Sequence, residues 1–140
     1  MTTKYHASNP EEIEGYASVF HVPDQQGDLM QPGAFRHTTI VGLPVLWQHR
    51  PYIPIGKVVA AKEDTKGLWF RLRLCTDTQL GREAMSLVRD GVLRGLSIGF
   101  RAIKASRGRG GLRRVIHKVT LTEISLVTFP SNPKAEVYLE

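Results

Sequence analysis

Three side chains with complementary chemistry lie in separate apolar stretches of this 140-residue chain. Ser97 stands between Gly95 and Gly99, His49 ends an apolar run, and Glu123 interrupts an otherwise apolar strand. A hydroxyl, an imidazole and a carboxylate are the parts of a nucleophile–base–orienter site. Flanking glycines allow other backbone to approach the hydroxyl closely. The sequence therefore makes Ser97, His49 and Glu123 the candidate catalytic residues.

Each of the three also has an ordinary interpretation. Serines are common in strands, and Ser97 lacks the helix that follows the serine of a nucleophile elbow. A histidine between Gln48 and Arg50 is most often a surface residue. Glu123 is more informative, because burying an unpaired carboxylate costs several kcal/mol and an inward-facing one needs a partner. The residues alone leave both a triad and three unrelated polar side chains open.

Other site chemistries find little support in the chain. The five histidines form no HxH or HExxH cluster, so no metal is expected. The stretch 108–111 lacks the strand-to-helix context of a phosphate loop. The single cysteine, Cys75, excludes an internal disulfide and is expected in the core of a strand. No cofactor is expected.

Length and composition place the chain among ordinary globular proteins. With 41% hydrophobic and 23% charged residues, 140 residues predict a single domain, 1–140, that is large enough for a real core. No stretch approaches the roughly 18 consecutive apolar residues of a membrane helix, so no membrane is expected as a partner.

The net charge of +6 comes from one segment. Residues 91–122 hold eight Lys or Arg and no Asp or Glu, whereas the rest of the chain holds 11 basic and 13 acidic side chains. A basic patch centred on Arg101 to Lys118 could bind an acidic protein or nucleic acid, or form a solvated hairpin. Nucleic acid is the least favoured partner, because Phe100 is the only aromatic side chain there for base stacking.

Alternation and turn signals predict a mainly β fold. One helix is expected over 76–90 and a second, short one over 32–39, and Asp64 to Gly67 is typical of a hairpin turn. Strands separated by turns favour a mainly antiparallel sheet closed into a barrel. The expected strands are 13–20, 43–49, 55–61, 68–75, 92–103, 112–118 and 119–128.

Six motifs, in order, give the chain a family resemblance. Together they resemble the prohead (capsid maturation) proteases of tailed phages of the HK97 type, over about Ile13 to Val137. The motifs are Gly15-Tyr16-Ala17 to Phe20, Asp28 to Phe35, Leu46-Trp47-Gln48-His49, Ile55-Gly56-Lys57, Gly95-Leu96-Ser97-Ile98-Gly99-Phe100 and Leu121 to Pro133.

The resemblance implies a serine endopeptidase with the fold of the herpesvirus assembly proteases, a closed antiparallel β-barrel ringed by helices. Such an enzyme works inside the procapsid in the bacterial host cytoplasm. It cleaves extensions of the major capsid protein or scaffold protein, and also itself. A homodimer is suggested by the herpesvirus relatives. Ending at Glu140, the chain is expected to be a mature or trimmed form. The competing hypothesis is a catalytically inactive structural or scaffold-associated capsid-assembly protein.

The same resemblance implies roles for the candidate residues. His49 matches the general base and Ser97 the nucleophile, while Glu123 stands in the late strand where the herpesvirus relatives carry a second histidine. Backbone N–H groups of Ser131 and Asn132 are the expected oxyanion donors, because the flanking prolines have none to give. The segment 101–114 is the rival source of those donors.

Overall fold

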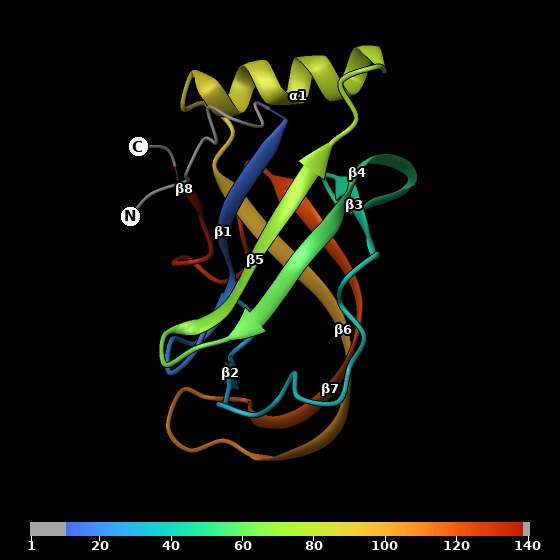
Figure 1. Cartoon of the computed structure of the whole chain (residues 1–140). Helices are drawn as coiled ribbons and strands as arrows, with labels where there is room; N and C mark the ends of the chain where they lie inside the picture. The colour runs from blue at the N-terminus through green and yellow to red at the C-terminus, as the bar shows by residue number, and fades with distance from the viewer. Residues whose placement is uncertain (1–10, 139–140) are drawn as a thin grey trace.

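The computed structural model describes residues 11–138, which form one curled β-sheet with a helix at one end (Figure 1). The elements, in chain order, are β1 (Glu12–Val19), β2 (Asp28–Met30), β3 (Pro44–Trp47), β4 (Arg50–Glu63), β5 (Gly67–Leu74), α1 (Gln79–Arg89), β6 (Gly95–Arg107), β7 (Arg114–Val127) and β8 (Val137–Tyr138). No helix within this range is long and apolar enough to cross a membrane.

Strand β7 organises the sheet. One edge of β7 pairs along its whole length with β6, in antiparallel register from Gly95↔Val127 to Arg107↔Arg114. Two further strands, β2 and β3, pair with β7 in parallel at different heights. The sheet then continues through β4, β5, β1 and β8, all in antiparallel pairs. The mainly β class is therefore confirmed. The two strands expected over 112–118 and 119–128 are one continuous strand, β7.

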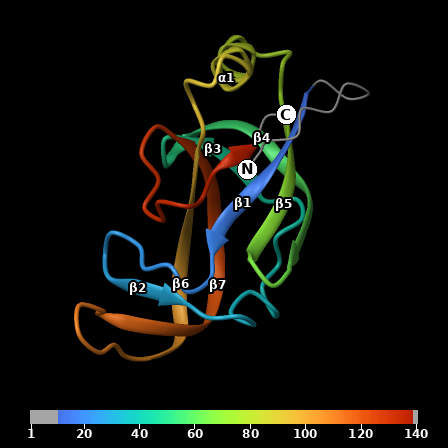
Figure 2. The same ribbon diagram turned by 90° about the vertical axis from the view of Figure 1, so that its left-hand side faces the viewer.

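The predicted closed barrel is wrong, because the sheet curls without closing (Figures 1 and 2). Within residues 11–138, β6 pairs with β7, and its other edge meets the segment before β8 only at the bridge Gly95↔Glu136. Beyond that bridge the edge of β6 borders a pocket instead of another strand. The expected ring of helices is also wrong, since α1 is the one helix in the described part of the chain.

The short helix predicted over 32–39 is replaced by successive turns. Gly33 has φ +92°, outside the helical region, and the Glu63 carboxylate accepts hydrogen bonds from the Gly33 and Phe35 N–H groups at 2.8 Å each. The N–H groups of Ala34, Arg36 and Thr38 instead bond the carbonyls three residues back, which closes turns in place of an α-helix. Sequence pattern alone could not reveal the tertiary contact with Glu63.

Helix α1 and the β4–β5 hairpin follow their predictions. The Thr78 hydroxyl caps α1 by accepting from the Gly81 N–H at 3.0 Å, and Gly91 ends the helix with φ +73°. At the hairpin, the Asp64 carboxylate accepts from the Lys66 and Gly67 N–H groups.

Strand β5 shows how the core is built. Its alternate apolar side chains are fully buried: Leu68, Phe70, Leu72 and Leu74. Because β5 ends at Leu74, Cys75 lies outside the strand and is exposed, so its predicted core position is wrong.

Candidate active site

The β6–β7 ladder places three polar side chains on one face of the sheet. Ser97 lies directly opposite Ser125, and Gly99 lies opposite Glu123. Directly paired residues share a face, and so do residues two apart on a strand. Ser97, Ser125 and Glu123 therefore point to the same side. Ser97 is 3% exposed and Ser125 is fully buried.

His49 occupies the tight turn between β3 and β4. Gln48 and His49 both have positive φ, 51° and 60°, which is uncommon for residues other than glycine. Gln48 fastens this turn to the end of β7. Its backbone N–H donates to the Leu126 carbonyl at 2.8 Å, its Nε2 donates to Thr128 Oγ1 at 2.8 Å, and its Oε1 accepts from the Thr128 N–H at 3.0 Å. The histidine is thus held beside the strand that carries Glu123.

His49 and Glu123 are hydrogen bonded through Nδ1 and Oε1. The same Oε1 accepts a second bond, from the Ser125 hydroxyl at 3.2 Å. The Glu123 side chain is only 20% exposed, whereas that of His49 is 43% exposed. In a neutral imidazole, a donating Nδ1 leaves Nε2 as a proton acceptor. This is the tautomer that a general base needs.

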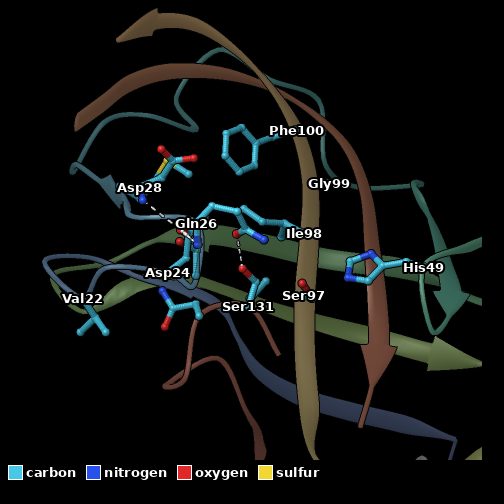
Figure 3. A pocket seen from close by; sticks show the side chains of 14 residues that line it. Val22, Asp24, Gln26, Asp28, His49, Ser97, Ile98, Gly99, Phe100 and Ser131 are labelled. Carbon is cyan, nitrogen blue, oxygen red and sulfur yellow. Dashed lines mark hydrogen bonds between the residues drawn. The ribbon is translucent and has the colours of Figure 1, made fainter. Parts of the chain in front are cut away.

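Ser97 and His49 line one pocket of about 330 Å³ (Figure 3). The β6 edge from Ser97 to Phe100 forms one wall. The segments 17–18 and 22–30 and the loop at Ser131 and Asn132 also supply lining residues. Figure 3 shows Ser97 and His49 toward one end, with Val22 and Asp28 toward the other. Ser97 is therefore reached through this pocket, and the open edge of β6 is its rim.

Two aspartates shape the far wall of the pocket. Asp24 accepts from the Gln26 and Asp28 N–H groups at 2.9 Å each, and burial raises the pKa of its carboxyl. Asp28 is 4% exposed and binds the guanidinium groups of both Arg113 and Arg114. The hydrogen bond from Arg114 is the main cause that lowers the pKa of Asp28. This cluster joins the β6–β7 hairpin to the pocket wall.

The loop with Ser131 and Asn132 is held by its side chains. Asn132 Nδ2 donates to the Val19 carbonyl at 3.2 Å, and Asn132 Oδ1 accepts from the Lys134 N–H at 3.0 Å. The Ser131 hydroxyl bonds Gln26 Oε1. Across residues 11–138, neither the Ser131 nor the Asn132 backbone N–H donates a hydrogen bond. Both residues line the pocket.

The basic segment lies outside the pocket. Residues 101–114, all of them described, are absent from the pocket lining, in which Phe100 is the last residue of β6. Asp28 forms ion pairs with Arg113 and Arg114. The basic side chains on β6 are exposed: Arg101, Lys104 and Arg107. In the described chain, no group of three His, Cys, Asp or Glu side chains could hold a metal ion.

The structure thus brings the predicted Ser97, His49 and Glu123 to one place, with Ser131 and Asn132 across the same pocket. Sequence reasoning missed Gln48, Ser125 and the Asp28 cluster. The polar Gln48 beside His49 was a visible signal, but its role depends on a partner 80 residues away. Ser125 gave no signal, because its importance comes from the β6–β7 register.

Sequence comparison places this arrangement in a known family. The family model described as the caudovirus prohead serine protease matches residues 1–140. The prohead protease of Enterobacteria phage HK97 is 32% identical over 130 residues, covering 89% of this chain and 58% of that protein. A capsid polyprotein of Pseudomonas phage PAJU2 is 34% identical over 133 residues, covering 89% of this chain and 19% of the polyprotein.

Two solved structures share the fold. The bacteriophage T4 capsid assembly protease gp21 superposes with a TM-score of 0.65 at 15% identity, covering 83% of this chain and 80% of gp21. The KSHV protease bound to a hexapeptide phosphonate inhibitor gives a TM-score of 0.64 at 14% identity, covering 90% of this chain and 63% of that protein. The predicted likeness to herpesvirus proteases is confirmed at the level of the fold.

The chain therefore belongs to the caudovirus prohead serine protease family. It spans about three-fifths of the length of the HK97 prohead protease and a fifth of the PAJU2 polyprotein.

Proposed function

We propose that this chain is a serine endopeptidase of phage capsid maturation, with Ser97 as nucleophile, His49 as general base and Glu123 as the residue that orients His49. The observation that carries the proposal is the His49 Nδ1–Glu123 Oε1 hydrogen bond, with His49 and Ser97 lining one pocket. Family membership supports the reaction class.

The geometry supports a two-step acyl transfer. His49 Nε2 takes the Ser97 hydroxyl proton as Oγ attacks the peptide carbonyl, and the imidazolium then gives that proton to the leaving amine. Water then attacks the acyl-enzyme as His49 removes its proton. The imidazolium gives that proton to Ser97 Oγ as the acyl bond breaks, which releases the new carboxyl end and restores the enzyme. Glu123 holds the Nδ1–H tautomer and stabilises the transient imidazolium.

The backbone N–H groups of Ser131 and Asn132 are the proposed oxyanion donors. Both residues line the pocket that contains Ser97, and their N–H groups have no other acceptor among residues 11–138. A donor fixed before the reaction stabilises the developing charge without reorganisation, which is worth about 3 to 4 kcal/mol in acyl-transfer enzymes. The side-chain bonds of Asn132 supply that fixation.

The proposed substrate is an extension of the major capsid or scaffold protein, together with the protease itself, inside the procapsid. A relative described as a capsid polyprotein and a structural neighbour described as a capsid assembly protease support this substrate class. The pocket runs along an unpaired stretch of β6, where an extended peptide could lie.

Covalent labelling tests the nucleophile. A fluorophosphonate reacts with serines activated by a general base, so wild-type protein should gain one adduct that maps to the Ser97 peptide by mass spectrometry. The Ser97→Ala and His49→Ala variants, shown to be folded by circular dichroism, should gain none. An adduct on a different serine, or equal labelling of Ser97→Ala, would reject the assignment. Absence of any adduct in the wild type would favour the inactive structural protein.

A further inference from the structure

Ser125 makes a contact that the triad itself does not explain. Its side chain is fully buried, and its hydroxyl donates to Glu123 Oε1 at 3.2 Å. That oxygen is the one that His49 Nδ1 bonds. A carboxylate oxygen can accept two hydrogen bonds, so the Ser125 and His49 contacts are compatible. The carboxylate oxygen is thereby fixed from two directions, one on β7 and one in the β3–β4 turn.

Gly99 leaves the space in which the Glu123 side chain lies. A Cβ atom built at Gly99 would lie 2.5 Å from Glu123 Cγ and 3.0 Å from both Glu123 Cδ and Thr122 Oγ1. Real Cβ atoms essentially never show the shorter of these contacts, so any side chain at this position displaces the glutamate. Gly99 does not have positive φ, so what it supplies is space, and the tightest contact in that space is with Glu123 Cγ.

We propose that Ser125 and Gly99 are positioning residues, which act on the reaction through Glu123. An unrestrained glutamate side chain samples several rotamers. Forming its hydrogen bond to His49 would then cost the side-chain entropy that is lost when one rotamer is fixed. The hydrogen bond from the Ser125 hydroxyl and the space left by Gly99 favour the Glu123 rotamer that reaches His49. Because Ser125 lies directly opposite Ser97, the same ladder row sets both the nucleophile and the residue that orients the acid. This inference rests on the proposed function.

The expected effect of each substitution is on turnover. Ser125→Ala removes a hydrogen bond to a charged group, and Gly99→Ala displaces Glu123, so each should lower kcat by roughly 10- to 100-fold with little change in KM. Ser106→Ala and Gly111→Ala are the matched controls. Ser106 is an exposed serine far along β6, and a Cβ at Gly111 would meet nothing within 4 Å. Both controls should retain wild-type kcat.

A double-mutant cycle separates positioning from general structural damage. In a Glu123→Ala background there is no carboxylate to hold, so adding Ser125→Ala should cause no further loss of kcat. Adding Gly99→Ala there should cost much less than in the wild type, because only the contact with Thr122 Oγ1 remains. If either substitution lowers kcat by the same factor in both backgrounds, the proposal is overturned.

A spectroscopic signature gives a second measurement that needs no activity. In folded Ser97→Ala protein, the Nδ1–H proton of His49 should give a low-field NMR resonance from its bond to Glu123. That resonance should disappear or move in Ser125→Ala and in Gly99→Ala, and remain in Ser106→Ala. An unchanged resonance in the first two variants contradicts the positioning roles. If the wild type lacks peptidase activity, the proposed function fails, and this resonance still decides whether Ser125 and Gly99 position Glu123.

Discussion

His49 is held in a backbone conformation that most residues avoid. Two consecutive non-glycine residues at positive φ cost about 1 to 3 kcal/mol each. The three hydrogen bonds of Gln48 to Leu126 and Thr128, each contributing about 0.5 to 1.5 kcal/mol, offset this cost. The strained turn holds the imidazole beside Glu123 of β7, as is common in preorganised active sites.

Loss of the Gln48 side chain should therefore loosen His49. In Gln48→Ala, we expect kcat to fall roughly tenfold with KM nearly unchanged, because the Thr128 bonds are lost while the pocket walls remain. Gln79→Ala, on the exposed face of α1, is the matched control and should be neutral. Steady-state kinetics on one peptide substrate would check this, and an unchanged kcat in Gln48→Ala would show that the turn holds itself.

The oxyanion proposal leads to a separate prediction for Asn132. Asn132→Ala removes the contacts to Val19 and Lys134 that hold the loop, so its N–H groups should be less well fixed. We expect kcat to fall by at least roughly 10-fold, but by less than the roughly 10²- to 10³-fold that follows removal of a whole oxyanion donor. Lys134→Ala, at an exposed position in the same loop, serves as the control. Equal kcat values for Asn132→Ala and wild type would move the oxyanion donors elsewhere.

At this scale, residue chemistry left a triad as one of two interpretations, the family resemblance favoured it, and the structure brings its members together. Glu123 could be identified from the sequence because a carboxylate among apolar residues needs a partner. Ser125 and Gln48 could not be predicted in the same way. Their importance depends on the β6–β7 register and on a contact between a turn and the end of β7, and single-residue chemistry contains neither.

Among the elements, β7 carries most of the site. It holds Glu123 and Ser125, pairs with the strand of Ser97, and receives the turn of His49. At its other end, Arg114 and the preceding Arg113 bind Asp28 and tie the β6–β7 hairpin to the pocket wall. The hairpin and the wall should therefore respond together when Asp28 changes.

The Asp28 cluster gives a pH-dependent prediction. Arg114 lowers the pKa of Asp28 in the folded state, so this stabilisation is fully present above the unfolded pKa of about 3.9. It is lost as the pH falls through the folded pKa. Asp28→Asn should lower the free energy of unfolding by about 1 to 3 kcal/mol at pH 7, and the gap from wild type should shrink in acid. Denaturant unfolding of both proteins at pH 7 and in acid would check this. A gap that stays constant with pH would contradict the ion-pair account.

Element boundaries were predictable where local signals decide them. The helix predicted over 76–90 is present between its caps Thr78 and Asp90, and the hairpin turn predicted at Asp64 is present. The helix expected over 32–39 is absent because Gly33 has positive φ and the backbone closes in successive turns, which Glu63, distant in sequence, holds at two N–H groups. The parallel pairing of β2 and β3 with β7 also has no local signature.

For the whole molecule, composition and alternation predicted a mainly β fold but not how the sheet ends. Closure depends on one last pairing, and at β6 that pairing shrinks to the Gly95↔Glu136 bridge. The opening that results borders the pocket of Ser97 and His49. An incomplete barrel thus leaves an unpaired strand edge beside the nucleophile, which a fully closed sheet would have covered.

The most direct test of the central claim is processing of the co-expressed capsid or scaffold protein. Wild type should shorten it, and itself, while folded Ser97→Ala and His49→Ala should leave both at full length on a gel and by mass. Glu123→Gln should retain partial processing, because it keeps the shape but loses the charge that stabilises the imidazolium. Unchanged processing by Ser97→Ala would contradict the catalytic assignment and support an inactive structural protein.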